Sequence, residues 1–140
     1  MQFVCDAPPH TWFRLETEGE AQVEAAGMKH AVDKYFRQAR EQAERSYVPP
    51  PTILYIERNI GLKAHIQRAM PLFLTLRNRD GQPLVTAMLP PGGKEDKAFR
   101  PIVVGEANGD PYPAHSEAIK LLGAHYGMTL DPARCFPYRR

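Results

Sequence analysis

Residues 71–89, PLFLTLRNRDGQPLVTAML, decide the fold class. Two apolar runs, LFLTLRN and PLVTAML, flank the polar residues RDGQ. A glycine that follows an aspartate between two such runs is the strongest short-range signal of a β-hairpin with a two-residue turn. The stretch therefore predicts two antiparallel strands joined by a tight turn.

The segments on either side extend the predicted sheet. Downstream, PPGGKEDKA at residues 90–98 is typical of a loop, and FRPIVVG at residues 99–105 is a third run of strand type. Upstream, TWFRLE at residues 11–16 places two aromatic residues beside alternating Arg14, Leu15 and Glu16, which favours a short strand. We therefore expect an antiparallel sheet of about four strands.

Residues 18–47 carry the strongest helical periodicity. Apolar side chains recur there at steps of three and four residues, with charged residues between them, which predicts one long amphipathic helix. The helix must end by VPPPT at residues 48–52, because three successive prolines remove backbone donors and force extended geometry. The apolar positions are Ala21, Ala25, Met28, Val32, Tyr35, Phe36, Ala39 and Ala43.

The next segment, TILYIERNIGLKAHIQRAMP, fits two periods. Its isoleucines at positions 53, 56 and 60 share one helical face, whereas Leu62, Ala64 and Ile66 alternate with polar residues as in a strand. Thr52 as a candidate cap and the stop at Pro71 favour a helix over residues 55–69, and the strand interpretation stays open.

A last helix is predicted to begin at His115 and Ser116 and to end near Gly127. The expected fold is therefore α+β: an antiparallel sheet with a long N-terminal helix, a second helix and a C-terminal helix packed against one face. With 140 residues, 43% of them hydrophobic, the chain can bury one core, and we expect a single domain over residues 1–140.

Charge and composition limit the expected partners. The 18 basic and 16 acidic residues give a net charge of +2, which disfavours nucleic acid as a partner. The aromatic tail CFPYRR could stack on bases, but it could equally pin the C-terminus to the core. The N-terminus lacks a signal-peptide pattern and no apolar stretch approaches the length of a bilayer, so we expect a soluble cytoplasmic protein without a membrane partner.

The loop over residues 105–116, GEANGDPYPAHS, is the first place to look for a ligand. A strand runs through a glycine-containing loop into a helix there, an arrangement whose free N–H groups can bind a small anion. A turn followed by a Ser116 helix cap is the favoured interpretation, because no phosphate-binding glycine motif is present. The candidate ligand-binding residues are His115, Ser116, Arg100, Glu106, Asn108 and Tyr112.

The chain carries no dense catalytic constellation. Its five histidines lack the short spacing of a metal-binding pair, so no metal or cofactor is predicted. Cys5 and Cys135 lie outside any metal, disulfide or nucleophile motif and are expected to be reduced thiols. His115 is the better catalytic candidate, because its loop also brings Glu106 and Tyr112.

These observations predict a small interaction or regulatory domain that acts through a helix face or a sheet edge on a protein partner, rather than an enzyme. A homodimer is expected through near-heptad apolar positions of the long helix. The alternative is a small-ligand or anion-binding protein, or an acid/base enzyme, with its site at the loop over residues 105–116. The near-heptad positions are Ala25, Met28, Val32, Tyr35 and Ala39.

Overall fold

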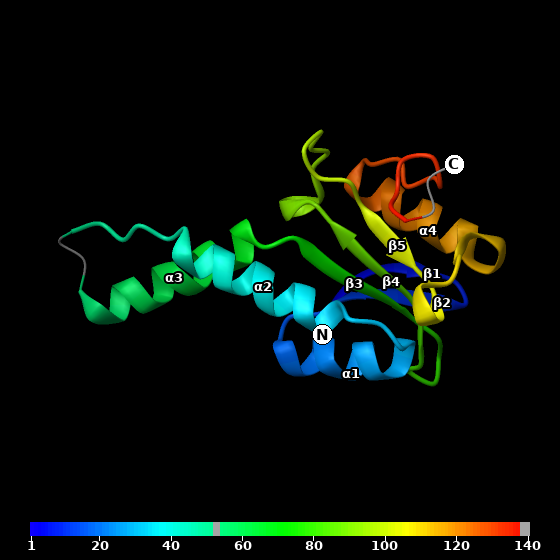
Figure 1. The fold of residues 1–140 in the computed structure, drawn as a ribbon, viewed down its shortest axis with the longest axis horizontal. Coiled ribbons are helices and arrows are strands. Elements are labelled where there is room, and N and C mark those ends of the chain that lie inside the picture. Colours follow the sequence, from blue (N-terminus) through cyan, green and yellow to red (C-terminus); the bar gives the residue numbers. More distant parts are fainter. Residues whose placement is uncertain (52–53, 138–140) are drawn as a thin grey trace.

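A five-stranded antiparallel sheet in the order β1-β2-β3-β4-β5 organises the computed structural model, which describes residues 1–51 and 54–137 (Figure 1). The α+β prediction is confirmed, with five strands rather than about four because the N-terminal strand β1 was not predicted. The strands are β1 (Gln2–Ala7), β2 (His10–Arg14), β3 (Leu72–Arg77), β4 (Pro83–Leu89) and β5 (Ile102–Val104).

The predicted hairpin is strands β3 and β4, paired from Leu72↔Leu89 through Thr75↔Thr86. Its connection is longer than the expected two residues and spans residues 78–82. The Asn78 side chain accepts hydrogen bonds from the backbone N–H groups of Asp80 and Gln82, at 3.0 and 2.9 Å. Gly81 takes a positive φ of 78°. The side chain of Asn78 therefore closes a wider turn than Asp-Gly alone would make.

Strand β3 lies in the middle of the sheet, and all six of its residues are buried. Alternate leucines join Trp12 and helix α4 (Tyr112–Tyr126) in one core, whereas Phe73 packs with helix α1 (Glu18–Met28) in a second core. Figure 1 shows α1 and α4 on opposite sides of the sheet. The expectation that all helices cover one face is therefore wrong, because both faces of β3 need cover.

The predicted helix over residues 18–47 is two helices, α1 and α2 (Val32–Arg45). Helix α1 begins with a capping box between Thr17 and Glu20 and ends at Lys29, which takes the left-handed conformation with φ 56°. The connection of three residues takes up nearly one helical turn, so the apolar residues of α2 stay in step with those of α1. Periodicity alone therefore could not reveal the break.

Helix α3 (Tyr55–Ala69) follows the helix interpretation and not the strand interpretation. It packs against α2, and the two helices extend together away from the sheet (Figure 1). Thr52, the candidate cap, and Ile53 lie outside the described residues.

Helix α4 begins at Tyr112, four residues before Ser116, so the predicted capping role of Ser116 is wrong. The carboxylate of Asp110 accepts a hydrogen bond from the Tyr112 N–H at 3.0 Å instead, and Ser116 is exposed in the second turn. The helix ends at Gly127 with φ 71°, as predicted. Beyond it, the Phe136 N–H donates to the Pro101 carbonyl, and the Val103 N–H donates to the Phe136 carbonyl, which covers the edge of β5. The tail residues 138–140 lie outside the described residues.

Candidate functional site

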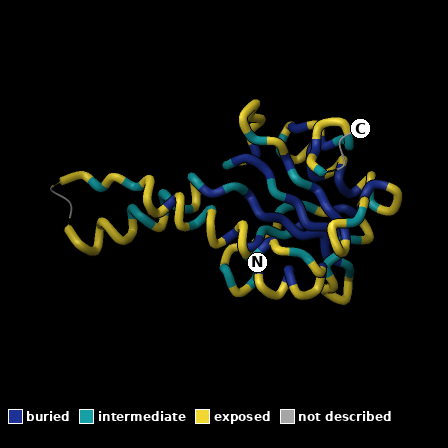
Figure 2. Tube along the Cα trace, viewed as in Figure 1, coloured by how far each residue is buried: buried dark blue, intermediate teal, exposed yellow. Residues whose placement is uncertain are grey.

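The most exposed part of the molecule is a helical arm, which we define as residues 44–51 and 54–65. It comprises the end of α2, the segment after it and most of α3, and it projects from the body (Figure 1). Figure 2 shows that exposed residues dominate it, whereas the sheet is buried. No residue of α3 is fully buried among those described, so the chain itself gives this helix little cover.

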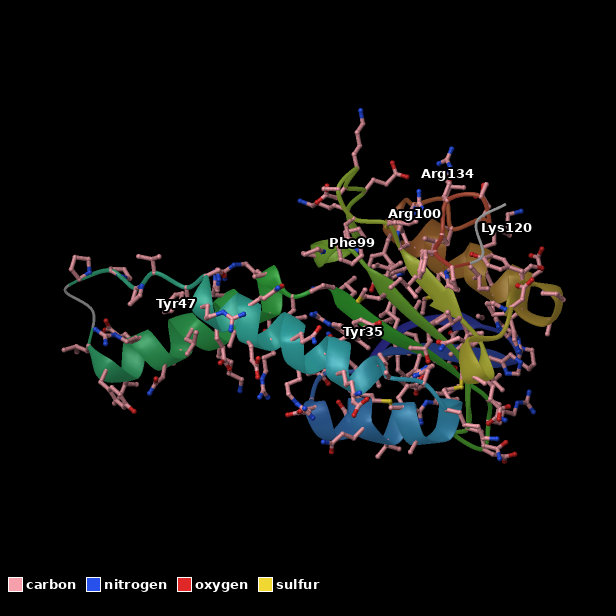
Figure 3. All side chains as sticks on the ribbon, in the orientation of Figure 1. Tyr35, Tyr47, Phe99, Arg100, Lys120 and Arg134 are labelled. Carbon is pink, nitrogen blue, oxygen red and sulfur yellow. The ribbon has the colours of Figure 1, made fainter. Side chains whose placement is uncertain are left out.

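One face of α3 is held by the two residues that follow α2. The Ser46 hydroxyl and the His65 Nε2 are 2.7 Å apart, and the rings of Tyr47 and His65 have centroids 5.4 Å apart. A Cβ at Gly61 would collide with the Tyr47 hydroxyl, so glycine is what allows this close approach. Figure 3 shows Tyr47 at the end of α2, where it meets α3. These contacts give the arm a defined inner face.

The outer face and tip of the arm carry apolar side chains without intramolecular cover. Within residues 1–51 and 54–137, five of the eleven exposed large hydrophobic residues lie there, each between 65 and 85% exposed. Exposed apolar side chains that gather on one part of a folded protein are typical of protein or membrane contacts. The five residues are Val48, Leu54, Tyr55, Ile56 and Ile60.

The sequence held a signal for this surface that the periodicity argument did not use. Helix α3 has apolar residues in two directions, with Leu62 and Ile66 on the side toward the body and Ile56 and Ile60 away from it. A helix that covers a single core needs one apolar stripe, so a second stripe indicates a second contact.

A buried polar network lies under α1 and is the second notable feature. The carboxylate of Glu24 accepts hydrogen bonds from Thr75 Oγ1 at 2.9 Å, Arg77 Nη2 at 2.7 Å and Thr86 Oγ1 at 2.5 Å. Because the Thr86 hydroxyl donates to Glu24, His30 Nε2 donates to that hydroxyl, at 2.8 Å. Burial lowers the pKa of His30, and the nearby Glu24 carboxylate partly opposes this change.

The cavity next to this network is small and largely apolar. Its volume is about 60 Å³, and its lining includes His30, Tyr35, Met88, Val104 and Asn108. That space suits about two water molecules rather than a cofactor. Since Glu24 already accepts three hydrogen bonds, the network fixes α1 on the sheet and leaves little capacity for a ligand.

Sequence reasoning did not single out Glu24, which it placed among the polar residues of the first helix. The sequence signal for a buried Glu24 was weak, because the residue type does not show whether a glutamate is buried or exposed. Its neighbours one turn away, Ala21 and Met28, are both core residues, and that spacing was the available hint.

The structure disperses the six candidate ligand-binding residues. Arg100 lines an open concavity of about 490 Å³ beside Arg134, and Figure 3 shows both residues in the upper part of the body. Asn108 lines the small cavity near His30 instead. Glu106 pairs with Lys29, with 3.1 Å between Oε1 and Nζ.

The remaining candidates lie along the first turns of α4. Tyr112 and Ser116 line a second open concavity of about 470 Å³. The Tyr112 hydroxyl donates to the Leu130 carbonyl at 2.8 Å, and burial raises the pKa of this phenol. The His115 ring contacts that of His10 with centroids 5.8 Å apart, and burial followed by the charge of His10 lowers the pKa of His115. The six residues therefore do not converge on one pocket.

Three further observations concern the part of the chain that the structure describes. It holds no group of three or more His, Cys, Asp or Glu side chains placed to bind a metal ion. None of its helices is both long enough and apolar enough to cross a bilayer. Cys5 and Cys135 are free thiols, and burial raises the pKa of each.

Comparison with known proteins gives no family: no protein-family model, curated protein or solved structure matches the chain. Function is therefore inferred from the geometry of the molecule. The arm exposes apolar surface, the Glu24 carboxylate already accepts three hydrogen bonds, and the six candidate ligand-binding residues lie in separate places.

Proposed function

We propose that this chain is a protein-interaction domain and that the arm is the surface with which it contacts its partner. The observation that carries the proposal is the set of five exposed apolar side chains on the arm. The inner face of α3, in contrast, is already in contact with Ser46. A loop that served to connect α2 to α3 would not need aliphatic residues in water.

The energetics of α3 favour the same function. Burial of one large aliphatic side chain stabilises a complex by about 1.5–3 kcal/mol, so several such residues represent a substantial driving force. An isolated helix of this length is marginally stable in water, and α3 receives little cover from its own chain. A bound partner would therefore stabilise the arm as well as bury its apolar surface.

The alternative, a small ligand or anion held by the loop over residues 105–116, stays a prediction with weaker support. Glu106 is engaged by Lys29, and Asp110 caps α4. The two open concavities carry residues of both charge signs, including Glu95 and Arg134 in the first and Glu117 and Lys120 in the second. No concentrated positive field for an anion results from this arrangement.

Site-specific photo-crosslinking in the native host tests the proposal. A photoreactive benzoylphenylalanine at position 56 is expected to give a covalent protein adduct, because Ile56 lies on the outer face of the arm. The same residue at position 23 is the matched control, since Val23 is also aliphatic and is 65% exposed, compared with 72% for Ile56, but lies on α1. Absence of an adduct at position 56, or equal adducts at both positions, would contradict the proposed function.

A further inference from the structure

Arg14, at the end of β2, is a partly buried cation without a carboxylate partner. In the part of the chain that the structure describes, three arginine and lysine residues are not exposed: Arg14, Arg40 and Arg77. Arg77 pairs with Glu24 and Arg40 pairs with two glutamates, whereas none of the ion pairs among the described residues includes Arg14. Charged groups that are withdrawn from water are normally paired, so Arg14 lacks the anion that the other two have.

The β1–β2 ladder and helix α4 form the surroundings of Arg14. Arg14 lies two residues after Trp12, whose indole N–H donates to the Ala118 carbonyl of α4 at 2.8 Å, so both side chains point to the face that α4 covers. Gln2 lies opposite Arg14 in the ladder and therefore points to the same face. Helix α4 packs on β1, and its last turn lies beside this end of the hairpin.

A concavity of about 290 Å³ opens where these elements meet. Its polar side chains are Gln2, Arg14, His125 and Tyr126, each of which can donate a hydrogen bond. Among the described residues, no Asp or Glu lines it, in contrast to the two larger concavities. Its volume is close to the lower limit of about 300–1,000 Å³ for small-molecule sites, so the space suits a small ligand.

The donors in this concavity are not fully used. Arg14 Nη2 donates to the Gln67 carbonyl at 3.3 Å, which occupies one of the five N–H groups of the guanidinium. Burial raises the pKa of Tyr126, and the positive charge of Arg14 partly opposes this change, so the two groups lie within electrostatic reach of each other. The Tyr126 hydroxyl therefore stays protonated at neutral pH and can donate beside the guanidinium.

The charge and the apolar part of the lining indicate the class of anion. Arg14 is the one described lining residue with a permanent positive charge, which matches a single carboxylate better than a phosphate with about two negative charges. A guanidinium can also bind both carboxylate oxygens at once. Val4 and Leu72 line the same concavity and pack with the core on the α4 side, so they provide an apolar wall next to the charge.

We propose that this concavity, which we call the Arg14 site, binds a small organic carboxylate. The carboxylate contacts Arg14 and Tyr126, and the apolar part of the molecule lies against Val4 and Leu72. The ligand supplies the anion that Arg14 lacks within its own chain. Because the site is formed by the hairpin and the end of α4, it is a second binding function and does not rest on the proposed function of the arm.

Titration of the full chain with sodium benzoate at constant ionic strength, followed by the backbone amide signals in NMR spectra, tests the Arg14 site. Benzoate is expected to bind with a Kd on the order of 1 mM, as a ligand of this size does, and to shift the signals of Gln2, Arg14 and Tyr126. Benzamide has nearly the same shape without the charge and should bind about tenfold more weakly. Equal binding of benzoate and benzamide, or no shift at these residues, would overturn the proposal.

Substitutions test the two donors separately. Arg14→Gln should weaken benzoate binding about tenfold and Tyr126→Phe about fivefold, because each removes a hydrogen bond to the charged group. Arg14→Lys keeps the charge without the planar fork, so its affinity should lie between those of Arg14→Gln and the wild type. Arg100→Gln is the matched control and should bind benzoate as the wild type does, since Arg100 is a cation that lines a different concavity. An unchanged affinity of folded Arg14→Gln would contradict the site.

The remaining outcomes separate this site from other anions and from the arm. Inorganic phosphate at the same ionic strength should bind more weakly than benzoate, and tighter binding of phosphate would overturn the carboxylate as the ligand class. Ile56→Ser changes the arm alone and should leave the affinity for benzoate unchanged. If the shifts are instead confined to the arm and vanish in Ile56→Ser, benzoate binds the apolar surface, and the Arg14 site fails while the proposed function of the arm stands.

Discussion

Single residues fix how α1 lies on the sheet, and Glu24 matters most among them. Its side chain is fully buried and is paired with Arg77, which is itself nearly buried. Two threonine hydroxyls from β3 and β4 complete the set, so one helix residue bonds to two strands. A buried charge is tolerated there because every strong donor finds an acceptor.

Removal of the Glu24 carboxylate should be costly. Glu24→Ala leaves Arg77 and two hydroxyls buried without their acceptor, and we expect a loss of about 3–5 kcal/mol in the free energy of unfolding. Urea denaturation followed by the fluorescence of Trp12, the single tryptophan, measures it. Glu44→Ala is the control, since its ion pair with Arg40 is exposed and should cost less than about 1 kcal/mol. Equal losses in the two variants would contradict the role of the network.

His30 should make stability depend on pH. Burial holds its folded-state pKa below the ordinary value of about 6.5, so the unfolded chain binds the proton more tightly. The stability contributed by neutral His30 is therefore present above that ordinary value and is lost as the pH falls through it toward the folded-state pKa. His115, whose pKa is also lowered, acts in the same direction.

Urea denaturation at pH 7.5, 6.5 and 5.5 measures this dependence. We expect the free energy of unfolding to fall toward acid pH, and His30→Gln, which can still donate to Thr86, should show a smaller fall. A pH dependence unchanged by His30→Gln would show that His30 does not contribute to it.

Sequence reasoning was least successful in predicting how the individual residues of the candidate site are arranged. It could name titratable residues in a loop, but it could not see that Asn108 and Arg100 line separate cavities. Glu24 is buried and Glu44 is exposed, and the amino-acid sequence does not distinguish these two environments of a glutamate. Nor could it see that Ile56 and Ile60, correctly placed on one helical face, have no core to meet.

At the scale of elements, hydrophobic period and turn chemistry predicted most of the fold. The β3–β4 hairpin, helix α3 and the end of α4 at Gly127 follow from local patterns. The strand β1 was missed because it lies at the edge of the sheet with most of its residues partly or fully exposed. The break between α1 and α2 was missed because a left-handed Lys29 has no sequence signature, unlike the glycine that usually ends a helix.

The turn between β4 and β5 gives a test of close packing between elements. Gly92 and Gly93 both take positive φ, at 70° and 69°. A Cβ at Gly93 would overlap the ring of Tyr126 on α4, whereas a Cβ at Gly92 meets nothing within 4 Å. Both substitutions by alanine carry backbone strain of about 1 kcal/mol, and Gly93→Ala adds a steric clash of about 1–3 kcal/mol.

Gly93→Ala should therefore reduce the free energy of unfolding clearly more than Gly92→Ala, as measured by urea denaturation. The matched pair separates the clash with Tyr126 from the strain of the backbone. Similar losses in both variants would indicate that the Tyr126 ring moves aside without cost.

The whole molecule divides into a body held by two cores and an arm that contributes to neither core beyond its base. The cores lie on opposite faces of one sheet, and the arm residues 44–51 and 54–65 belong to neither. We therefore expect that the arm can be changed or removed with little effect on the free energy of unfolding of the body.

Replacement of residues 48–60 by four glycine and serine residues tests this separation. The Tyr47 hydroxyl lies against Gly61, so the two backbones are separated by about the length of one tyrosine side chain, which four linker residues can span. At low protein concentration the variant should unfold within about 1 kcal/mol of the wild type, because no core contact is removed. Collapse of the body on removal of these residues would show that the arm is part of the fold.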